Sequence, residues 1–340
     1  MMKFEPLTKD NWQTWNDFVS SQSRSSIYHL AEWSFVFKET YGYDNQFTLL
    51  SQDNTPVGII PLIREKGLFK NILITTDSGI LIDNDNVQKR EVIKYVLNMK
   101  KKCKANDVVL INSSIEETEF KKNYENVSVR KIIPQNQRIL WKEIGTKRRN
   151  MVRKAEKHDL SILIREPDRL SIKKFYRIYS RNYRDLGTPV HSIRFFHNQA
   201  KLLYDKIKIL FVQYGSRIIG TMWLLHYKET MIDSEAASLR KYLYTGVNDY
   251  IYYKAFEYAV DKQCNVFDMG RSQLNSGTYR FKTSWGHCRV DKYEVASRDS
   301  MKSISKNKEK YKIFIILWKN CPTYLTNIAG PWVRKNMVMQ

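Results

Sequence analysis

Apolar residues in the first third of the chain recur in short runs that predict β-strands. The predicted strands lie at 46–50, 57–63, 72–75 and 107–111. Before the last of them, apolar residues fall at helical spacing and predict a helix over 88–103, with Val92, Ile93, Val96 and Leu97 on one face. A helix between strands is typical of a mixed α/β domain.

From Gly145 the pattern changes to a basic segment, KRRNMVRKAEKHDL, which predicts a helix that opens a second domain. A hairpin of strands at 207–214 and 217–226 around Gly215-Ser216 follows. The other predicted elements of this half are strands at 161–164, 231–237 and 266–268 and helices at 171–185, 192–204 and 248–263. We therefore predict an α/β protein with mixed sheets. Its tandem domains would be residues 1–144 and 145–299, followed by a tail at 300–340.

The predicted tail combines lysines with bulky apolar residues, and two interpretations are open. It could form an amphipathic helix on an anionic membrane surface, or a helix whose apolar stripe packs on the second domain. Its longest apolar run, 313–318, is far shorter than the roughly 20 residues that a membrane-spanning helix needs. The first residues also lack the basic start and apolar run of a signal peptide. We expect a soluble cytoplasmic protein, with peripheral contact at the inner face of the membrane as an open alternative.

The composition adds a strong positive charge and removes several functional classes. The chain has 57 Lys and Arg against 35 Asp and Glu, a formal charge of +22, which favours polyanionic partners such as RNA, anionic lipid or phosphorylated substrates. Its four cysteines have no spacing typical of a zinc site or a disulfide framework, and no HExxH, GxSxG or Walker pattern occurs. We expect no metal and no permanently bound cofactor.

The segment after the predicted strand 231–237, SLRKYLYTGVN, is a candidate phosphate site. A helix start offers unpaired N–H groups and the positive end of the helix dipole to phosphate oxygens. The segment lacks a glycine-rich phosphate pattern, so an ordinary capped helix is the alternative. The predicted donor-binding residues are Arg240, Lys241, Gly246, Val247 and Asn248, with Asn248 as the N-cap of the following helix.

Carboxylates on two predicted strands are candidates for a general base. By the two-residue period of a strand, Asp233 and Glu235 should point to the same face of the sheet. A carboxylate whose pKa is raised by partial burial can accept the proton of an attacking amine. Glu235 is the leading candidate and Asp268 the second, and for Glu235 a structural ion pair is the alternative.

The segment from Phe267 to Gly286, FDMGRSQLNSGTYRFKTSWG, joins a strand end to a loop rich in aromatic and cationic residues. Asp268 and Arg271 would lie at the carboxyl end of a central strand, where open α/β sheets bind their ligands. Aromatic residues that stack on RNA bases are a second interpretation, although the spacing matches no RNA-recognition signature.

This segment resembles the signature FDFGRS…GTYRFKxxWG of the FemAB-like acyltransferases of the GNAT superfamily. Three further stretches agree in the expected order, SIYHLAEWSFVFKETYGYD, KRRNMVRKAEKHDL and YRIYSRNYRDLGTPVHSIRFF, so the resemblance spans most of the chain. It implies two tandem GNAT-like domains, with donor and acceptor bound in the second domain and in a cleft between the two. The substrate-binding residues that it implies are Arg149, Arg153, Asp185, Arg271, Tyr279 and Lys282.

The resemblance also implies transfer of an acyl or aminoacyl group to an amine by direct attack in a ternary complex. Relatives that form peptidoglycan bridges use aminoacyl-tRNA as donor and a lipid-linked muropeptide as acceptor, and others use acyl-CoA. This chain lacks a recognisable long helical insertion of the kind linked to tRNA, which favours acyl-CoA. The expected acceptor is an amine of a cell-envelope, polysaccharide or peptide component. A non-catalytic basic platform that binds RNA or anionic glycolipid is the alternative from another class.

Overall fold

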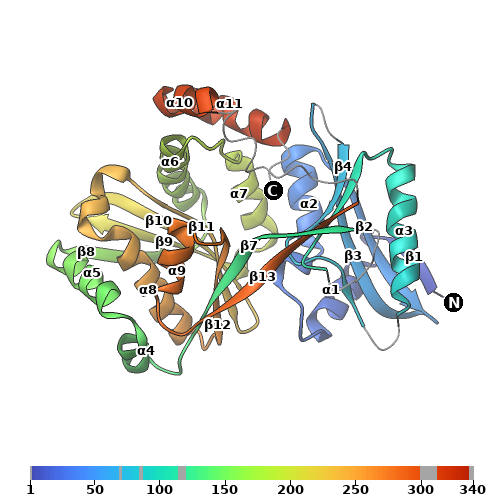
Figure 1. The fold of residues 1–340 in the computed structure, drawn as a ribbon, viewed down its shortest axis with the longest axis horizontal. Coiled ribbons are helices and arrows are strands. Elements are labelled where there is room, and N and C mark those ends of the chain that lie inside the picture. The colour runs from blue at the N-terminus through green and yellow to red at the C-terminus, as the bar shows by residue number, and fades with distance from the viewer. Residues whose placement is uncertain (1, 69–70, 84–86, 114–119, 299–311, 337–340) are drawn as a thin grey trace. The chain divides into compact units, whose positions relative to one another are not determined.

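A computed structural model describes residues 2–68, 71–83, 87–113, 120–298 and 312–336 (Figure 1). The chain divides into two compact units, the first comprising 1–124, 294–309 and 331–340 and the second comprising 125–293 and 310–330. Residue 145, the predicted start of the second domain, lies inside the second unit. The lysine-rich beginning of the predicted tail, 300–311, lies outside the described residues.

The first unit has the strand order β1-β2-β3-β4-β6-β13, in which β4 and β6 are parallel and the other neighbours are antiparallel. Its strands are β1 (Met2–Pro6), β2 (Asp44–Gln52), β3 (Thr55–Lys66), β4 (Asn71–Thr75), β5 (Leu81–Ile82), β6 (Asp107–Ile111) and the end of β13 (Cys288–Ser297). Its helices are α1 (Trp12–Ser21), the 3₁₀-helix η1 (Ile27–His29), α2 (Glu32–Tyr41) and α3 (Lys89–Lys102). The predicted helix at 88–103 is confirmed as α3, whose Val92, Ile93 and Val96 are buried in the core of this unit.

The second unit has the strand order β7-β12-β11-β10-β9-β8, with one parallel pair, β11 and β12, at its centre. Its strands are β7 (Lys121–Ile132), β8 (Leu160–Arg165), β9 (Ile207–Tyr214), β10 (Arg217–Tyr227), β11 (Thr230–Ser238) and β12 (Val266–Gln273). Its helices are α4 (Gln137–Glu143), α5 (Thr146–Lys157), α6 (Arg169–Leu186), α7 (Ile193–Leu202), η2 (Tyr204–Lys206), η3 (Arg240–Thr245), α8 (Val247–Asp261), α9 (Gly277–Thr283), α10 (Lys312–Asn320) and most of α11 (Thr323–Asn336).

Helices cover both faces of this second sheet (Figure 1). On one face α6 and α7 pack against β10 and β11, where Phe175, Phe196 and Trp223 form an aromatic cluster. On the other face α8 is the central helix, and its Phe256 packs edge-on against Phe267 of β12. Because the sheet carries apolar side chains on both faces, its central strands are buried, as in the predicted mixed α/β class.

The last two helices of the chain pack on α6 (Figure 1). The close approach of α10 to the end of α6 requires a glycine at position 187, because a Cβ there would lie 2.6 Å from the side chain of Ile315. Trp318 of α10 is buried, and so are Thr326 and Gly330 of α11. One stripe of each helix therefore packs on the second unit. Within the described residues, no helix has both the length and the apolar character needed to cross a bilayer.

Candidate active site

The two central strands of the second unit separate at their carboxyl ends. β11 and β12 are paired over three residues each, from Thr230 with Val266 to Ile232 with Asp268. Beyond these pairs β11 continues beside β10, and β12 continues beside β7. Backbone groups that face the point of separation have no ladder partner across it in the described structure, and such groups must be satisfied by other donors and acceptors. This point is where the polar side chains of the unit gather.

A β-bulge in β11 changes the directions of its two carboxylates. On β10, Trp223 pairs with Glu235 and the next residue, Leu224, pairs with Asp233, so β11 contains one extra residue at this position. Because neighbouring residues of β10 point to opposite faces, Asp233 and Glu235 also do. The prediction that both carboxylates point to the same face was wrong, because side chains alternate strictly between faces only in a strand without a bulge.

Asp233 lies on the face covered by α8 and α9. Its Oδ2 accepts a hydrogen bond from the buried Tyr252 hydroxyl. Its Oδ1 is closed off from solvent and has no hydrogen-bond partner among the described residues. Burial raises the pKa of Asp233 to about 6, although the Tyr252 hydrogen bond and the charge of Lys282 act in the opposite direction. A carboxylate with these properties is half-protonated near pH 6 and mostly ionised at neutral pH, so it is suited to accepting a proton.

Lys282 lies beside Asp233 and is only 6% exposed. Its Nζ donates to the carbonyl oxygens of Gly270 and Arg271, both at 3.1 Å. Burial lowers the pKa of Lys282, and the nearby carboxylates of Asp233 and Asp268 oppose that shift. An ammonium group has three N–H donors, so one donor of Lys282 remains beyond these two hydrogen bonds in the described structure. Lys282, which was predicted to bind substrate, is thus a buried cation at the point where β11 and β12 separate.

Asp268 orients the backbone around this cation. Its carboxylate accepts hydrogen bonds from Arg130 Nε at 3.0 Å, from the Gly270 N–H at 2.7 Å and from Ser128 Oγ at 3.3 Å. A second bulge lies here, between Asp268 and Arg271, and Gly270 has a φ of +69° that favours glycine. With its oxygens occupied in this way, Asp268 fixes the turn whose carbonyl groups hold Lys282.

Glu235, the leading base candidate from the sequence, lies on the α6 and α7 face. The Tyr183 hydroxyl of α6 donates to its Oε2. The His191 ring, just before α7, lies 3.9 Å from its Oε1. Glu235 is therefore separated by the sheet from Asp233 and Lys282.

The predicted phosphate segment is the 3₁₀-helix η3 followed by α8. Arg240, Lys241 and Asn248 are exposed, while Gly246 and Val247 are buried. The predicted N-cap was wrong: Gly246, with a φ of +85°, precedes the helix, and Asn248 is inside its first turn. A Cβ on Gly246 would lie 2.7 Å from the carbonyl oxygen of Met151, so the start of α8 packs tightly on α5. The exposed part of this segment is what a ligand could reach.

A buried ion pair that sequence reasoning missed fixes this helix start. Arg148 Nη1 lies 2.5 Å from Asp249 Oδ1, and both side chains are largely buried. Arg148 also donates to Ser284 Oγ at 2.8 Å and lies over the Phe281 ring. The basic run of α5 and the aromatic run of α9 were the available signals, but nothing in the pattern pairs Arg148 with an acid that lies 101 residues later in the chain.

The remaining predicted substrate-binding residues do not join this cluster as one group. Arg149 donates to the carbonyl oxygens of Lys142, at 3.2 Å, and Ile144 at the end of α4. Arg153 lies over the Trp141 ring. The other three are Asp185, which is paired with Arg184 on α6, Arg271, which is exposed over Tyr293, and Tyr279, which is partly buried on α9.

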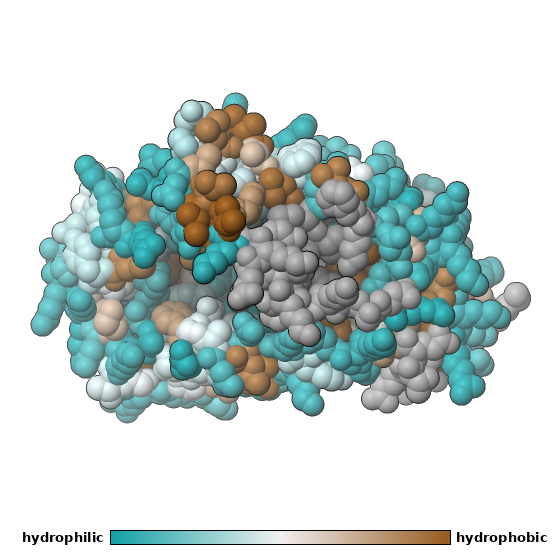
Figure 2. All heavy atoms as spheres, turned by 45° about the horizontal axis from the view of Figure 1, so that its top comes forward, coloured by the Kyte–Doolittle hydropathy of each residue, from teal (hydrophilic) through white to brown (hydrophobic). Residues whose placement is uncertain are grey.

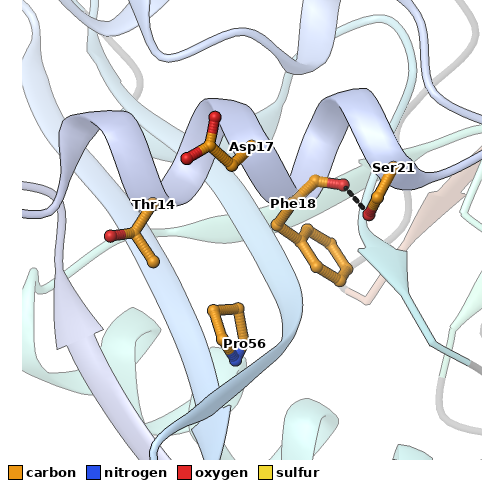
Figure 3. A pocket seen from close by; sticks show the side chains of 5 residues that line it. All are labelled: Thr14, Asp17, Phe18, Ser21 and Pro56. Carbon is orange, nitrogen blue, oxygen red and sulfur yellow. Dashed lines mark hydrogen bonds between the residues drawn. The ribbon is translucent and has the colours of Figure 1, made fainter.

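A shallow pocket lies elsewhere, on the first unit between α1 and β3 (Figure 3). It is lined by Thr14, Asp17, Phe18, Ser21 and Pro56. Four of these residues come from one face of α1, and Ser21 Oγ donates to the Phe18 carbonyl oxygen at 2.8 Å. With one carboxylate and no cation in its lining, this pocket offers no acyl-transfer chemistry comparable to that of the Asp233 cluster.

Comparisons with known proteins concern the fold of the chain. Residues 146–283 match the family model of the acetyltransferase (GNAT) domain. Among solved structures, FemX is similar with a TM-score of 0.66 and 14% identity, over 92% of this chain and 100% of that chain. L-PGS from Bacillus licheniformis has a TM-score of 0.59 and 11% identity, over 93% of this chain and 97% of that chain. A tandem GNAT protein from the clavulanic acid biosynthesis pathway has a TM-score of 0.56 and 6% identity, over 87% of this chain and 98% of that chain. A comparison with curated proteins finds no match.

Proposed function

We propose that this chain transfers an acyl or aminoacyl group to an amine, because residues 146–283 match the model of a GNAT domain and the fold is similar to those of FemX and a tandem GNAT protein. The observation that carries the proposal is the buried cluster of Asp233, Tyr252 and Lys282 at the separation of β11 and β12. A buried cation beside a carboxylate of raised pKa supplies the two functions that acyl transfer needs, which are charge stabilisation and proton acceptance.

The donor would lie along the separated strands. An extended chain can hydrogen-bond to a strand edge that lacks a neighbour, as an added strand does. Phosphate groups at the far end of the donor would contact the exposed Arg240, Lys241 and Asn248 at the start of α8. Arg271 is exposed near Lys282 and would contact a further anionic group of the donor or acceptor.

The reaction would be a direct displacement. The acceptor nitrogen attacks the donor carbonyl carbon, and a C–N bond forms as the C–S bond of a thioester or the C–O bond of an ester breaks. The third N–H of Lys282 stabilises the oxyanion of the tetrahedral intermediate, and Asp233 accepts the amine proton at Oδ1. The leaving sulfur or oxygen then takes this proton from Asp233, so protons and charge balance and the carboxylate is regenerated without a covalent enzyme intermediate.

The proposed donors are acyl-CoA and, as a second class, aminoacyl-tRNA, and the proposed acceptor is an amine of a cell-envelope, polysaccharide or peptide component. The test is incubation of the full chain with labelled acetyl-CoA, longer acyl-CoA and aminoacyl-tRNA, with amino sugars and amino-terminal peptides as acceptors. Consumption of one donor, dependent on acceptor, is the expected result. If no donor is bound or consumed while RNA binds in a salt-sensitive way, the basic-platform alternative is favoured instead.

Variants then separate the residues of the site. Lys282→Met should lower kcat/KM by about 10²–10³-fold, the usual effect of losing one oxyanion donor. Lys201→Met, which removes an exposed lysine of α7, is the matched control and should leave the rate unchanged. Among the carboxylates, Asp233→Asn should remove the ascending limb of the pH–rate profile near pH 6, whereas Glu235→Gln should retain it. The reverse pattern would assign the base to Glu235.

A further inference from the structure

The C-terminal helices carry a second apolar face that points away from the second unit. Figure 2 shows apolar residues gathered on the exposed side of α10 and α11. Ile313 and Ile328 are 74% and 75% exposed, the highest values among the large apolar residues of the described chain. The exposed residues of this outer face are Ile313, Ile316, Leu317, Tyr324, Leu325, Ile328 and Trp332.

The spacing of these residues places them on one side of each helix. In α10 the first three follow the i, i+3, i+4 pattern. In α11, Tyr324, Ile328 and Trp332 follow the i, i+4, i+8 pattern. The buried residues Trp318 and Thr326 lie on the inner stripes. Each helix therefore has an inner stripe that packs on the protein and an outer apolar stripe that is largely exposed.

The charged residues of α10 and α11 themselves have a single sign. No Asp or Glu occurs after Glu309 in the sequence, whereas Lys312 and Lys319 are exposed at the two ends of α10 and Arg334 and Lys335 follow Trp332. An apolar helical face with flanking lysines, Tyr and Trp is the pattern of helices that lie in the interface of an anionic bilayer. A second copy of this basic chain would have to bring two lysine-rich surfaces together, and RNA would leave the aliphatic side chains exposed to water.

We propose that α10 and α11 together form a docking surface for an anionic phospholipid membrane. The outer side chains would enter the boundary between headgroups and acyl chains, and the lysines would remain at the headgroups. This inference goes beyond the proposed function, because it concerns where the protein binds and does not depend on which group it transfers. It would bring the second unit to a surface where a lipid-linked amine acceptor is concentrated.

The test is sedimentation of the full chain with vesicles of phosphatidylcholine alone or with about 30% phosphatidylglycerol, at physiological salt. The wild type should bind the anionic vesicles at least about tenfold more tightly than the neutral ones, since each basic residue near the surface contributes about fivefold. The triple variant Ile316→Ser, Leu317→Ser, Ile328→Ser should lose at least about tenfold in affinity. Lys312→Glu with Lys319→Glu should lose about 25-fold or more.

The matched control removes three exposed leucines outside the helical pair, through Leu68→Ser, Leu170→Ser and Leu274→Ser. It should bind as the wild type does, and circular dichroism should show that each variant folds. Equal binding by the α10 and α11 variants and the wild type would overturn the proposal, as would the absence of wild-type binding to both vesicle types. Light scattering that shows a wild-type dimer, made monomeric by the triple serine variant without any vesicle binding, would assign the face to a second copy. Donor consumption measured on the same preparations keeps this outcome distinct from failure of the proposed activity.

Discussion

Removing the charge of Asp233 should make the protein more stable at high pH and change its stability least at low pH. In the folded chain the pKa of this carboxyl is raised to about 6 from 3.8 by burial. Below about pH 3 it is protonated in both the folded and the unfolded state, so its ionisation has no effect. Between pH 4 and 6 the folded state holds more protons than the unfolded state, and the free energy of unfolding therefore falls as the pH rises.

The size of the effect follows from the shift. A difference of about two pKa units corresponds to about 3 kcal/mol, the full cost being present above pH 6. Asp233→Asn keeps the shape of the side chain and an acceptor for Tyr252, and it removes the ionisation. For a unit of this size, 1 kcal/mol corresponds to about 2–4 °C in Tm. The Tm of the variant relative to the wild type should thus rise by about 6–12 °C between pH 4 and pH 8.

Scanning calorimetry of both proteins at intervals from about pH 4 to pH 8 measures this difference. The value at pH 4 is an internal reference, because most of the ionisation cost is still absent there while the other effects of the substitution are present. Tyr252→Phe should act in the opposite sense and steepen the dependence, since it removes the hydrogen bond that holds the pKa of Asp233 down. A relative Tm that stays constant from pH 4 to pH 8 would refute the view that a desolvated carboxylate lies at the separation of the strands.

Two further predictions concern the packing that supports the site. Arg148→Met should destabilise the protein by about 3–5 kcal/mol, because it leaves the buried Asp249 carboxylate without a partner, and adding Asp249→Asn should recover much of the loss. Additive losses in this double-mutant cycle, measured by thermal melting, would contradict the coupling. Gly246→Ala should lower the Tm more than Gly215→Ala, since both glycines have positive φ but only the Gly246 Cβ would meet backbone, the Met151 carbonyl oxygen, at 2.7 Å. Equal losses in the two alanine variants would show that contact with α5 has no cost.

Elements with a strong apolar period could be predicted from the sequence, and elements held by their neighbours could not. The hairpin of β9 and β10 was evident because two apolar runs flank the Gly215-Ser216 turn. By contrast β7 is polar over its first half, and its residues up to Asn126 are mostly exposed. β12 continues past Asp268 into the polar residues up to Gln273, since it pairs there with β7. Pairing partners determine such segments, and local composition does not reveal them.

The residues of the candidate site likewise include some that could be predicted from the sequence and some that could not. Lys282 was found because it lies in a long segment whose order of residues resembles a known family. Tyr252 was missed because it stands among several tyrosines of α8, with no spacing that links it to a residue of β11. The interpretation of the carboxylates failed for a more specific reason. A single extra residue between Asp233 and Glu235 in β11, opposite Trp223 and Leu224 of β10, reverses the alternation, and a bulge leaves no periodic signal in the sequence.

The bulge in β11 gives the two faces of this strand different chemistry. Asp233 is turned toward Lys282 and the buried core under α8, where low polarity raises its pKa and strengthens its attraction to the lysine. Glu235 is turned toward Tyr183 and His191, which can hold it by hydrogen bonds on the opposite face. Without the extra residue both carboxylates would share one face, and their mutual repulsion would oppose the ionisation of each. The irregular ladder thus allows one strand to present a carboxylate to each side of the sheet, and only Asp233 is positioned to act together with the buried cation.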